Sequence, residues 1–217
     1  MYELSSEKGK EEMDIRTAAM YLEGRKPKVM EMKKHCAVLI PLVWHKDEMY
    51  LLLEVRSGSV SQPGEICFPG GGVEKKERPM DCVVRETQEE TGIPKHAIRI
   101  LGQFDSMCNY TNMQIDTFVG AIAYQDVCKA VPNPEEVSEL FLVPLKFFEE
   151  TEPYIYEYEV APTIGDDFPY EQLGDCPDKY NWRRGKFTVP IYHYEGKVIW
   201  GLTARIIRHF LAEMPKE

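Results

Sequence analysis

The sequence predicts an α+β fold, a layered sandwich of strands and helices. Two apolar runs, 35–44 and 49–55, flank a short polar turn and are typical of paired buried strands. An amphipathic segment that ends at Gly92 then interrupts the strand-like segments as a crossover helix. After further strands, a strand at 186–194 and an amphipathic helix at 198–214 are expected to close the chain.

The N-terminal residues predict a short extension ahead of the folded domain. Residues 14–23 have the apolar spacing of a helix, and Gly24 and Pro27 are expected to end it. We therefore expect an extension at residues 1–34 that contains this helix, followed by one domain at residues 35–217. A chain of 217 residues is long enough for one such domain with a large core.

The segment between the first two strands and the crossover helix is rich in turn residues. Residues 57–64 predict a loop, and 65–69 predict a short strand that runs into the glycines at 70–72. Pro79 suits the first turn of the following helix, where its missing N–H has no cost. Gly92 suits the position just after the helix.

The second half of the chain predicts two further strands at 98–104 and 114–123. Residues 133–144 read as an acidic turn followed by a strand that ends at a proline, and 145–150 as a short helix. Residues 153–185 hold many aromatic, acidic, glycine and proline residues without clear periodicity. We therefore expect them to form an irregular insertion.

Composition and charge limit the partners of the protein. The chain is 43% hydrophobic and 29% charged, as is ordinary for a soluble globular protein. The 26 Lys and Arg residues against 36 Asp and Glu residues give a net charge of −10. Since nucleic-acid binding needs a basic surface, we expect no nucleic-acid partner. An anionic substrate must then rely on bound metal and a few local cations.

The cysteines and the hydropathy pattern predict the compartment. No two of the six cysteines form a C-x-x-C pair and several lie in apolar runs, so we expect buried, reduced thiols. No apolar run approaches the roughly 18 residues of a membrane span. The charged N-terminus lacks the apolar core of a signal peptide. These observations predict a cytoplasmic protein without a membrane partner.

The chemistry is concentrated on the predicted crossover helix. Glu86, Glu89 and Glu90 stand at positions i, i+3 and i+4, so their carboxylates share one helix face. Like charges at this spacing repel, and the usual interpretation is a solvated face. A divalent cation, Mg²⁺ or Mn²⁺, would turn the repulsion into a binding site. The glycines at 70–72 allow the backbone to approach a ligand closely.

The spacing of the whole stretch favours the metal-site interpretation. It fits the pattern G-x5-E-x7-R-E-U-x-E-E-x-G-U, where U is a bulky aliphatic residue, with Thr87 as the exception at the first U. On this signature the chain resembles the Nudix hydrolase superfamily. The matching residues are Gly71, Glu77, Arg85, Glu86, Glu89, Glu90, Gly92 and Ile93.

The resemblance implies a fold and an activity. The fold is an α/β/α sandwich around a mixed β-sheet, and the reaction is metal-dependent hydrolysis of a nucleoside diphosphate linked to another moiety. Transfer of the family's roles makes Glu86 and Glu90 metal ligands and places Glu89 at a second metal or at a bound water. A backbone carbonyl at Gly71 or Gly70 would add a further ligand. Arg85 would orient the carboxylates. Glu77 would support the loop, and Gly92 would end the helix.

Two interpretations of the catalytic base stay open in the sequence. The family often supplies a carboxylate from outside the signature, and Glu136, in the E-E-V that precedes an apolar strand, is the best match. The competing view of Glu136 is a solvated acid beside Glu135 and Glu139. Alternatively a signature glutamate such as Glu89 activates the water directly.

The region before the signature resembles the coenzyme A diphosphatase subfamily. In L-L-E-V-R-S-G-S-V-S-Q-P-G-E-I-C-F-P-G-G the matching positions imply a substrate-binding element that includes Arg56, Ser57, Phe68 and Gly70. The C-terminal I-W-G-L-T-A also resembles this subfamily. Ser61 stands where the subfamily usually has an arginine, so the 3′-phosphate of coenzyme A needs another cation. Besides Arg56, the candidates are Arg183, Arg184 and Lys186.

The sequence therefore predicts a hydrolase that cleaves coenzyme A or acyl-coenzyme A to 3′,5′-ADP and (acyl-)phosphopantetheine, with Mg²⁺ or Mn²⁺ as cofactor. One alternative is hydrolysis of ADP-ribose, dinucleotides or nucleotide sugars. An alternative of another class is a non-catalytic nucleotide-sensing Nudix module. A homodimer is a further expectation that comes from the resemblance.

Overall fold

A computed structural model of the chain describes residues 14–173 and 180–215. Its contacts divide the chain into two compact units, 1–32 and 33–217. In the first unit, α1 (Ile15–Leu22) begins after Asp14, whose carboxylate accepts a hydrogen bond from the backbone N–H of Thr17 at 2.7 Å. The predicted N-terminal helix is therefore confirmed. Residues 1–13 of the expected extension, and Cys176, lie outside the described residues.

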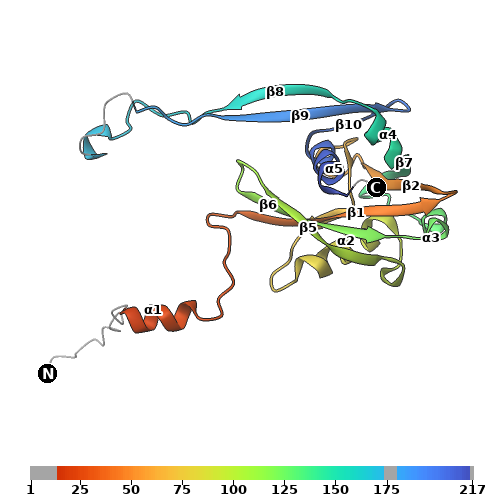
Figure 1. Cartoon of the computed structure of the whole chain (residues 1–217), viewed down its shortest axis with the longest axis horizontal. Helices are drawn as coiled ribbons and strands as arrows, with labels where there is room; N and C mark the ends of the chain where they lie inside the picture. Colours follow the sequence, from red (N-terminus) through yellow and green to blue (C-terminus); the bar gives the residue numbers. More distant parts are fainter. Residues whose placement is uncertain (1–13, 174–179, 216–217) are drawn as a thin grey trace. The chain divides into compact units, whose positions relative to one another are not determined.

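The second unit is built on a mixed sheet (Figure 1). Within the described residues its strands follow the order β3-β2-β1-β6-β5, and β4 and β7 join as further partners of β1 and β2. The β1–β6 pair is parallel, and the other pairs are antiparallel. The strands are β1 (Lys34–His45), β2 (Glu48–Arg56), β3 (Ile66–Cys67), β4 (Gly70–Gly72), β5 (Arg99–Cys108), β6 (Met113–Ala121) and β7 (Val137–Pro144).

A smaller antiparallel sheet and several helices complete the unit. The smaller sheet has the order β10-β9-β8, and in Figure 1 its long strands lie beyond α5 from the larger sheet. Its strands are β8 (Tyr154–Val160), β9 (Gly185–Tyr194) and β10 (Lys197–Trp200). The helices are α2 (Pro79–Thr91), α3 (Tyr124–Lys129), α4 (Leu145–Glu150) and α5 (Gly201–Glu213), with short 3₁₀ turns η1 (Lys95–Ala97) and η2 (Tyr170–Leu173).

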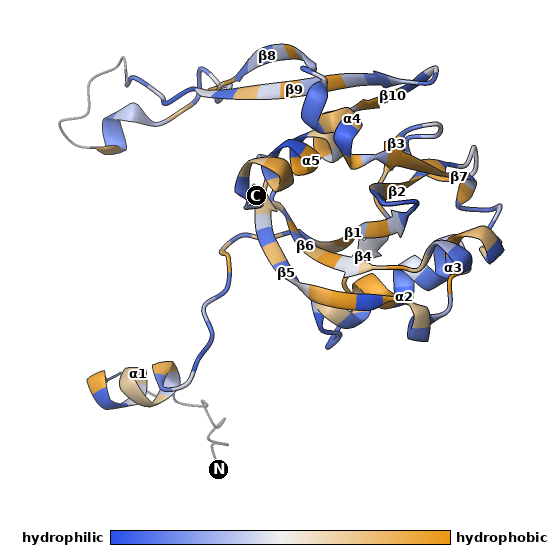
Figure 2. Cartoon of the chain, turned by 45° about the vertical axis from the view of Figure 1, so that its right-hand side comes forward, coloured by the Kyte–Doolittle hydropathy of each residue, from blue (hydrophilic) through white to orange (hydrophobic). Residues whose placement is uncertain are grey.

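The larger sheet is covered by a helix on each face. Successive side chains of a strand point to opposite faces, and β2 shows this alternation. Leu51 and Leu53 pack with Ile207 and Phe210 of α5, whereas Leu52 belongs to the cluster around Val83 of α2. Figure 2 shows hydrophobic residues on the strands of the larger sheet and on α5. The predicted α/β/α sandwich with a mixed sheet is therefore confirmed.

The glycine segment crosses from one strand of the sheet to the next. Ile66 on β3 pairs with Val55 of β2, whereas Gly70 on β4 pairs with Val38 of β1. Gly70 has φ 151°, and a Cβ at this position would overlap the backbone carbonyl of Ala37. Only glycine fits this approach, and the crossing places the segment beside α2.

Two predicted elements differ from the structure because their strand partners are distant in sequence. The expected helix at 198–214 begins only at Gly201, since residues 197–200 pair with β9 as β10. The expected irregular insertion at 153–185 contains β8, which pairs with β9 along its whole length. Neither pairing has a local signal comparable to helical periodicity.

The cysteine prediction is partly wrong. The cysteines of the described residues form no disulfide, and Cys36 and Cys82 are buried as expected. Cys108 and Cys128 are exposed, because Cys108 ends the edge strand β5 and Cys128 lies on the short helix α3. None of the helices in residues 14–173 and 180–215 has the length and apolar content that crossing a bilayer requires.

Candidate carboxylate site on helix α2

Helix α2 has the local structure that the sequence predicts. Pro79 occupies the first turn, and Gly92 ends the helix in the left-handed conformation with φ 74°, its N–H bonded to the Gln88 carbonyl at 2.9 Å. Thr87, at the position where an aliphatic residue is usual, is fully buried. Its hydroxyl donates to the Val83 carbonyl at 2.7 Å, so no polar atom is left unpaired.

Arg85 donates hydrogen bonds to three carboxylates. Its Nε and Nη2 donate to the two oxygens of Glu77 at 2.9 and 3.0 Å. Its Nη1 donates to Glu86 at 2.9 Å and to Glu89 at 3.0 Å. The hydrogen bonds from Arg85 lower the pKa of Glu77 to about 2. Arg85 is therefore hydrogen-bonded to Glu77 as well as to Glu86 and Glu89 of its own helix.

Glu90 lies where α2 meets the glycine segment. It is 6% exposed, and its carboxylate accepts a hydrogen bond from the backbone N–H of Gly70 at 2.8 Å. Burial, and next the negative charge of Glu54, raise the pKa of Glu90 to about 9. Burial also raises the pKa of Glu86. These carboxylates are therefore held in a poorly solvated, negatively charged place.

Gly71 and Glu86 are in direct contact. A Cβ added to Gly71 would overlap the carboxylate carbon and both oxygens of Glu86. A Cβ added to Gly72 would meet nothing within 4 Å. Of these two glycines, only Gly71 leaves space that the Glu86 carboxylate occupies.

Hydrogen bonds bring Glu136 toward the helix. The backbone N–H of Ser57 donates to the Glu136 carbonyl at 2.8 Å, and the Ser57 hydroxyl donates to the Glu135 carbonyl. The N–H of Asn133 donates to the carbonyl of Glu90 at 2.9 Å. The charge of Glu136 also contributes to the raised pKa of Glu90. The loop is thus tied to both β2 and α2.

Glu54 is a member of the cluster that the sequence analysis missed. It lies on β2 and is 1% exposed. One carboxylate oxygen lies 3.3 Å from the Cys67 thiol, and the other has no hydrogen-bond partner among the described residues. Burial raises its pKa to about 7. The available signal was an acid within the apolar run L-L-L-E-V, where a strand buried on both faces has no use for charge.

The other predicted site residues lie around this cluster. Arg56 is half-buried, and its Nε donates to the carbonyl of Ser61 at 2.9 Å. Phe68 is 4% exposed and packs in the core on the α5 face. Gly92, at the C-terminal end of α2, has the carbonyl of Val131 against it.

Two of the cations that the sequence proposed for a distal phosphate already have acidic neighbours on the smaller sheet. Arg184 lies 3.5 Å from Glu159, and Lys186 lies 2.8 Å from Glu157. Arg183 is exposed.

The oxygen donors near α2 suit a hard divalent cation, although their side chains do not point at one common position. In the part of the chain that is described, no three His, Cys, Asp or Glu side chains are arranged around a common metal position. Glu86 and Glu89 are instead bonded to Arg85. Oxygen donors at Glu86 and Glu90, and the unpartnered oxygen of Glu54, are nevertheless the chemistry that Mg²⁺ and Mn²⁺ prefer.

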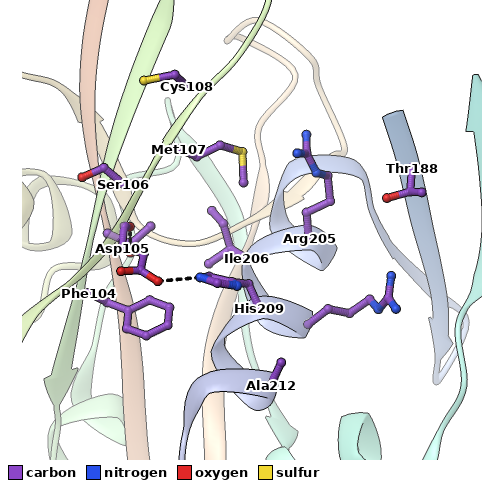
Figure 3. Close-up of a pocket in the computed structure, with 12 residues that line it drawn as sticks. Phe104, Asp105, Ser106, Met107, Cys108, Thr188, Arg205, Ile206, His209 and Ala212 are labelled. Atoms are coloured by element: carbon purple, nitrogen blue, oxygen red, sulfur yellow. Dashed lines mark hydrogen bonds and ion pairs between the residues drawn. The ribbon is translucent and has the colours of Figure 1, made fainter. Parts of the chain in front are cut away.

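A cavity of about 560 Å³ opens on the α5 face of the larger sheet (Figure 3). Arg205, Arg208 and His209 of α5 line it opposite β5, and His209 pairs with Asp105 at 2.6 Å. Its volume lies within the roughly 300–1,000 Å³ of small-molecule sites. The cationic side chains would favour an anionic ligand.

The cavity lies at the level of the glycine segment along the strands. Gly70 pairs with Val38, and Val38 pairs with Thr117, which lines the cavity. Two strand spacings therefore separate Gly70 from Thr117 across the sheet, or about 10 Å.

Comparison with known proteins agrees with this geometry. The family profile described as NUDIX domain matches residues 33–160. A protein named "Uncharacterized Nudix hydrolase NudL" from Yersinia enterocolitica is 32% identical over 187 residues, which cover 83% of this chain and 81% of that protein. The mouse peroxisomal coenzyme A diphosphatase NUDT7 is 33% identical over 138 residues, which cover 61% of this chain and 55% of that protein.

A solved structure shows the same fold. The crystal structure of a MutT/nudix family protein from Enterococcus faecalis superposes with a TM-score of 0.50 at 15% identity, covering 95% of this chain and 73% of that one. Nudix hydrolases generally use divalent metal ions. From its sequence signature, its fold and these relatives, the chain belongs to the Nudix hydrolase family of pyrophosphohydrolases.

Proposed function

We propose that this protein is a Mg²⁺- or Mn²⁺-dependent pyrophosphohydrolase that cleaves coenzyme A or acyl-coenzyme A. The products are 3′,5′-ADP and (acyl-)phosphopantetheine. The observation that carries the proposal is the meeting of the Glu86 and Glu90 carboxylates with the backbone of Gly70 and Gly71. The 33% identity to a coenzyme A diphosphatase over 138 residues supports this substrate.

In this proposal Glu86 and Glu90 hold the cation, and Glu89 and the carbonyl of Gly71 add ligands. When bound, the ion neutralises charge on the phosphate oxygens and lowers the pKa of a water. Arg85 keeps Glu86 and Glu89 on the same side of α2, because one guanidinium nitrogen bonds to both. Glu77 holds the other side of that guanidinium.

In this proposal Glu136 is the general base. Its loop is bonded to α2 through Asn133 and to β2 through Ser57, so its position depends on both elements. Glu89, the other candidate, is hydrogen-bonded to Arg85 at 3.0 Å. Glu136 would take a proton from the attacking water as the water oxygen bonds to one phosphorus. The bond from that phosphorus to the bridging oxygen then breaks, and two phosphate monoesters result.

The α5-face cavity is the place we assign to the distal phosphate. Arg205 and Arg208 line this cavity and supply positive charge for the phosphate. Arg184 and Lys186 are less suited to that role, because both already have acidic neighbours. The backbone of Thr117, which lines the cavity, is two strand spacings from Gly70, or about 10 Å. Arg56 and Ser57 stand at the end of β2, beside the Glu136 loop.

The test is hydrolysis with Mg²⁺ or Mn²⁺ of coenzyme A, acetyl-coenzyme A, dephospho-coenzyme A, ADP-ribose, NADH and a diadenosine polyphosphate, with products identified by mass spectrometry. We expect coenzyme A to give 3′,5′-ADP and phosphopantetheine, and dephospho-coenzyme A to react more slowly. Faster cleavage of ADP-ribose or a dinucleotide would reassign the substrate. Equal rates for coenzyme A and dephospho-coenzyme A would remove the phosphate role of the cavity.

A variant of the carboxylate site gives the control. Glu90→Gln should reduce turnover by about 100-fold or more while the protein stays folded, since the carboxylate cluster is not needed for stability. Glu149→Gln, an exposed glutamate of α4, is the matched substitution and should leave the rate unchanged. Full activity of Glu90→Gln would remove Glu90 from the mechanism.

A further inference from the structure

Glu54 is a charge that the fold does not need. It stands on β2 directly after Leu51, Leu52 and Leu53, all fully buried, and it is itself 1% exposed. Burying a carboxylate removes its hydration, which is unfavourable unless a partner replaces the water. An apolar side chain would continue this strand without that cost. A functional ligand is therefore the natural explanation for the acid.

The protein supplies little to satisfy this carboxylate. One oxygen faces the thiol of Cys67, a weak donor, at 3.3 Å, and the other oxygen is unpartnered within the described residues. The nearby cation Arg56 directs its Nε to the carbonyl of Ser61. The remaining charges that act on Glu54 are negative and come from Glu136 and the α2 glutamates.

A proton on Glu54 would not resolve this arrangement. A carboxylic acid also needs an acceptor for its O–H, and no described side chain accepts from the free oxygen. A divalent cation between β2 and α2 would satisfy that oxygen. It would also offset the repulsion between Glu54 and Glu90. Among the neighbouring charges, that of Glu54 acts most strongly on Glu90.

We propose that Glu54 is a further ligand of the divalent cation held by Glu86 and Glu90, supplied by β2 from outside the signature helix. This inference rests on the proposed function, which places the cation at α2. It adds one consequence: the cation connects two elements that meet only in the folded protein. Metal binding should then stabilise the fold by a free energy that grows with the logarithm of the affinity, to which Glu54 contributes.

The experiment measures metal binding without substrate. Free Mn²⁺ is followed by electron paramagnetic resonance during titration of the wild-type protein, Glu54→Gln and Glu48→Gln. Glu48 lies at the opposite end of β2 and serves as the matched control. We expect the dissociation constant for Mn²⁺ to rise at least about ten-fold in Glu54→Gln and to stay unchanged in Glu48→Gln.

Thermal unfolding gives a second readout. Without metal, Glu54→Gln should be at least as stable as wild type, because a buried negative charge is removed. With saturating Mn²⁺ its gain in melting temperature should be smaller than that of wild type. Should Glu54→Gln fail to fold, Glu54→Leu suits the apolar strand and enters the same titration with the same expected loss of affinity.

The outcomes separate this inference from the function on which it rests. If wild type binds Mn²⁺ and hydrolyses coenzyme A while Glu54→Gln gives the same Mn²⁺ isotherm, the inference is overturned and the function stands. If wild type takes up no Mn²⁺, the cation site fails and both are overturned. Weaker binding by Glu54→Gln, with partial recovery in Glu54→Asp, supports Glu54 as a ligand.

Discussion

Gly71 packs directly against the carboxylate of Glu86. The Glu86 oxygens occupy the space that a Cβ at position 71 would need. The contact joins β4 to α2 at the residue proposed to hold metal. It explains why the segment needs a residue without a side chain where the backbone φ does not require glycine.

Gly71→Ala should therefore displace Glu86 and reduce turnover by about 100-fold, as misplacement of a catalytic group by about 1 Å can do. The neighbouring Gly72→Ala is the matched control, since its Cβ would meet nothing within 4 Å. Steady-state rates and melting temperatures of both variants check this. Equal rates for the two variants would show that the contact has no effect on the reaction.

Arg85→Lys should lower activity by about 10- to 100-fold although the charge is kept. An ammonium group cannot reproduce the four hydrogen bonds that the guanidinium of Arg85 donates to Glu77, Glu86 and Glu89. Arg78→Lys tests the same substitution on the exposed Arg78–Asp81 pair and should leave the rate unchanged. An Arg85→Lys enzyme with wild-type rates would contradict the positioning role.

Gly92→Ala should destabilise the protein by more than about 2 kcal/mol. Any residue with a side chain at positive φ costs about 1–2 kcal/mol, and here a Cβ would also overlap the carbonyl of Val131. Gly196→Ala separates the two effects, because Gly196 has φ 79° and open space around it. Urea denaturation of both variants measures the difference, and equal losses of stability would exclude the overlap as a cause.

The Arg85–Glu77 pair should make stability depend on acid pH. Hydrogen bonds from Arg85 lower the pKa of Glu77 from 4.5 to about 2 in the folded protein, so folding favours the ionised form. The stabilisation is then fully present above about pH 4.5 and is lost as the pH falls toward 2. The difference in free energy of unfolding between wild type and Glu77→Gln should shrink between pH 6 and pH 3. Urea denaturation at each pH measures this difference. A difference that stays constant across the range would refute the contribution of the pair.

The elements predicted correctly have short-range causes. Helix α2 begins at Pro79 and stops at Gly92 because each residue acts on its own turn of the helix. The i, i+4 pair of Arg85 and Glu89 forms for the same reason. Strand β10 was predicted as helix, and β8 as irregular, because both depend on pairing with β9. A neighbouring strand overrides weak local preferences.

The signature and its spacing determined, without coordinates, the family, the sandwich and the shared face of the α2 glutamates. These follow from residues within a few positions of one another, whose relation a helix sets by itself. Only the tertiary structure decided that Glu54 joins Glu90, that the loop of Glu136 is bonded to β2 and α2, and that Arg205 lines a cavity. Those contacts join segments tens of residues apart, and they depend on strand order and register and on the packing of α2 and α5 on the sheet.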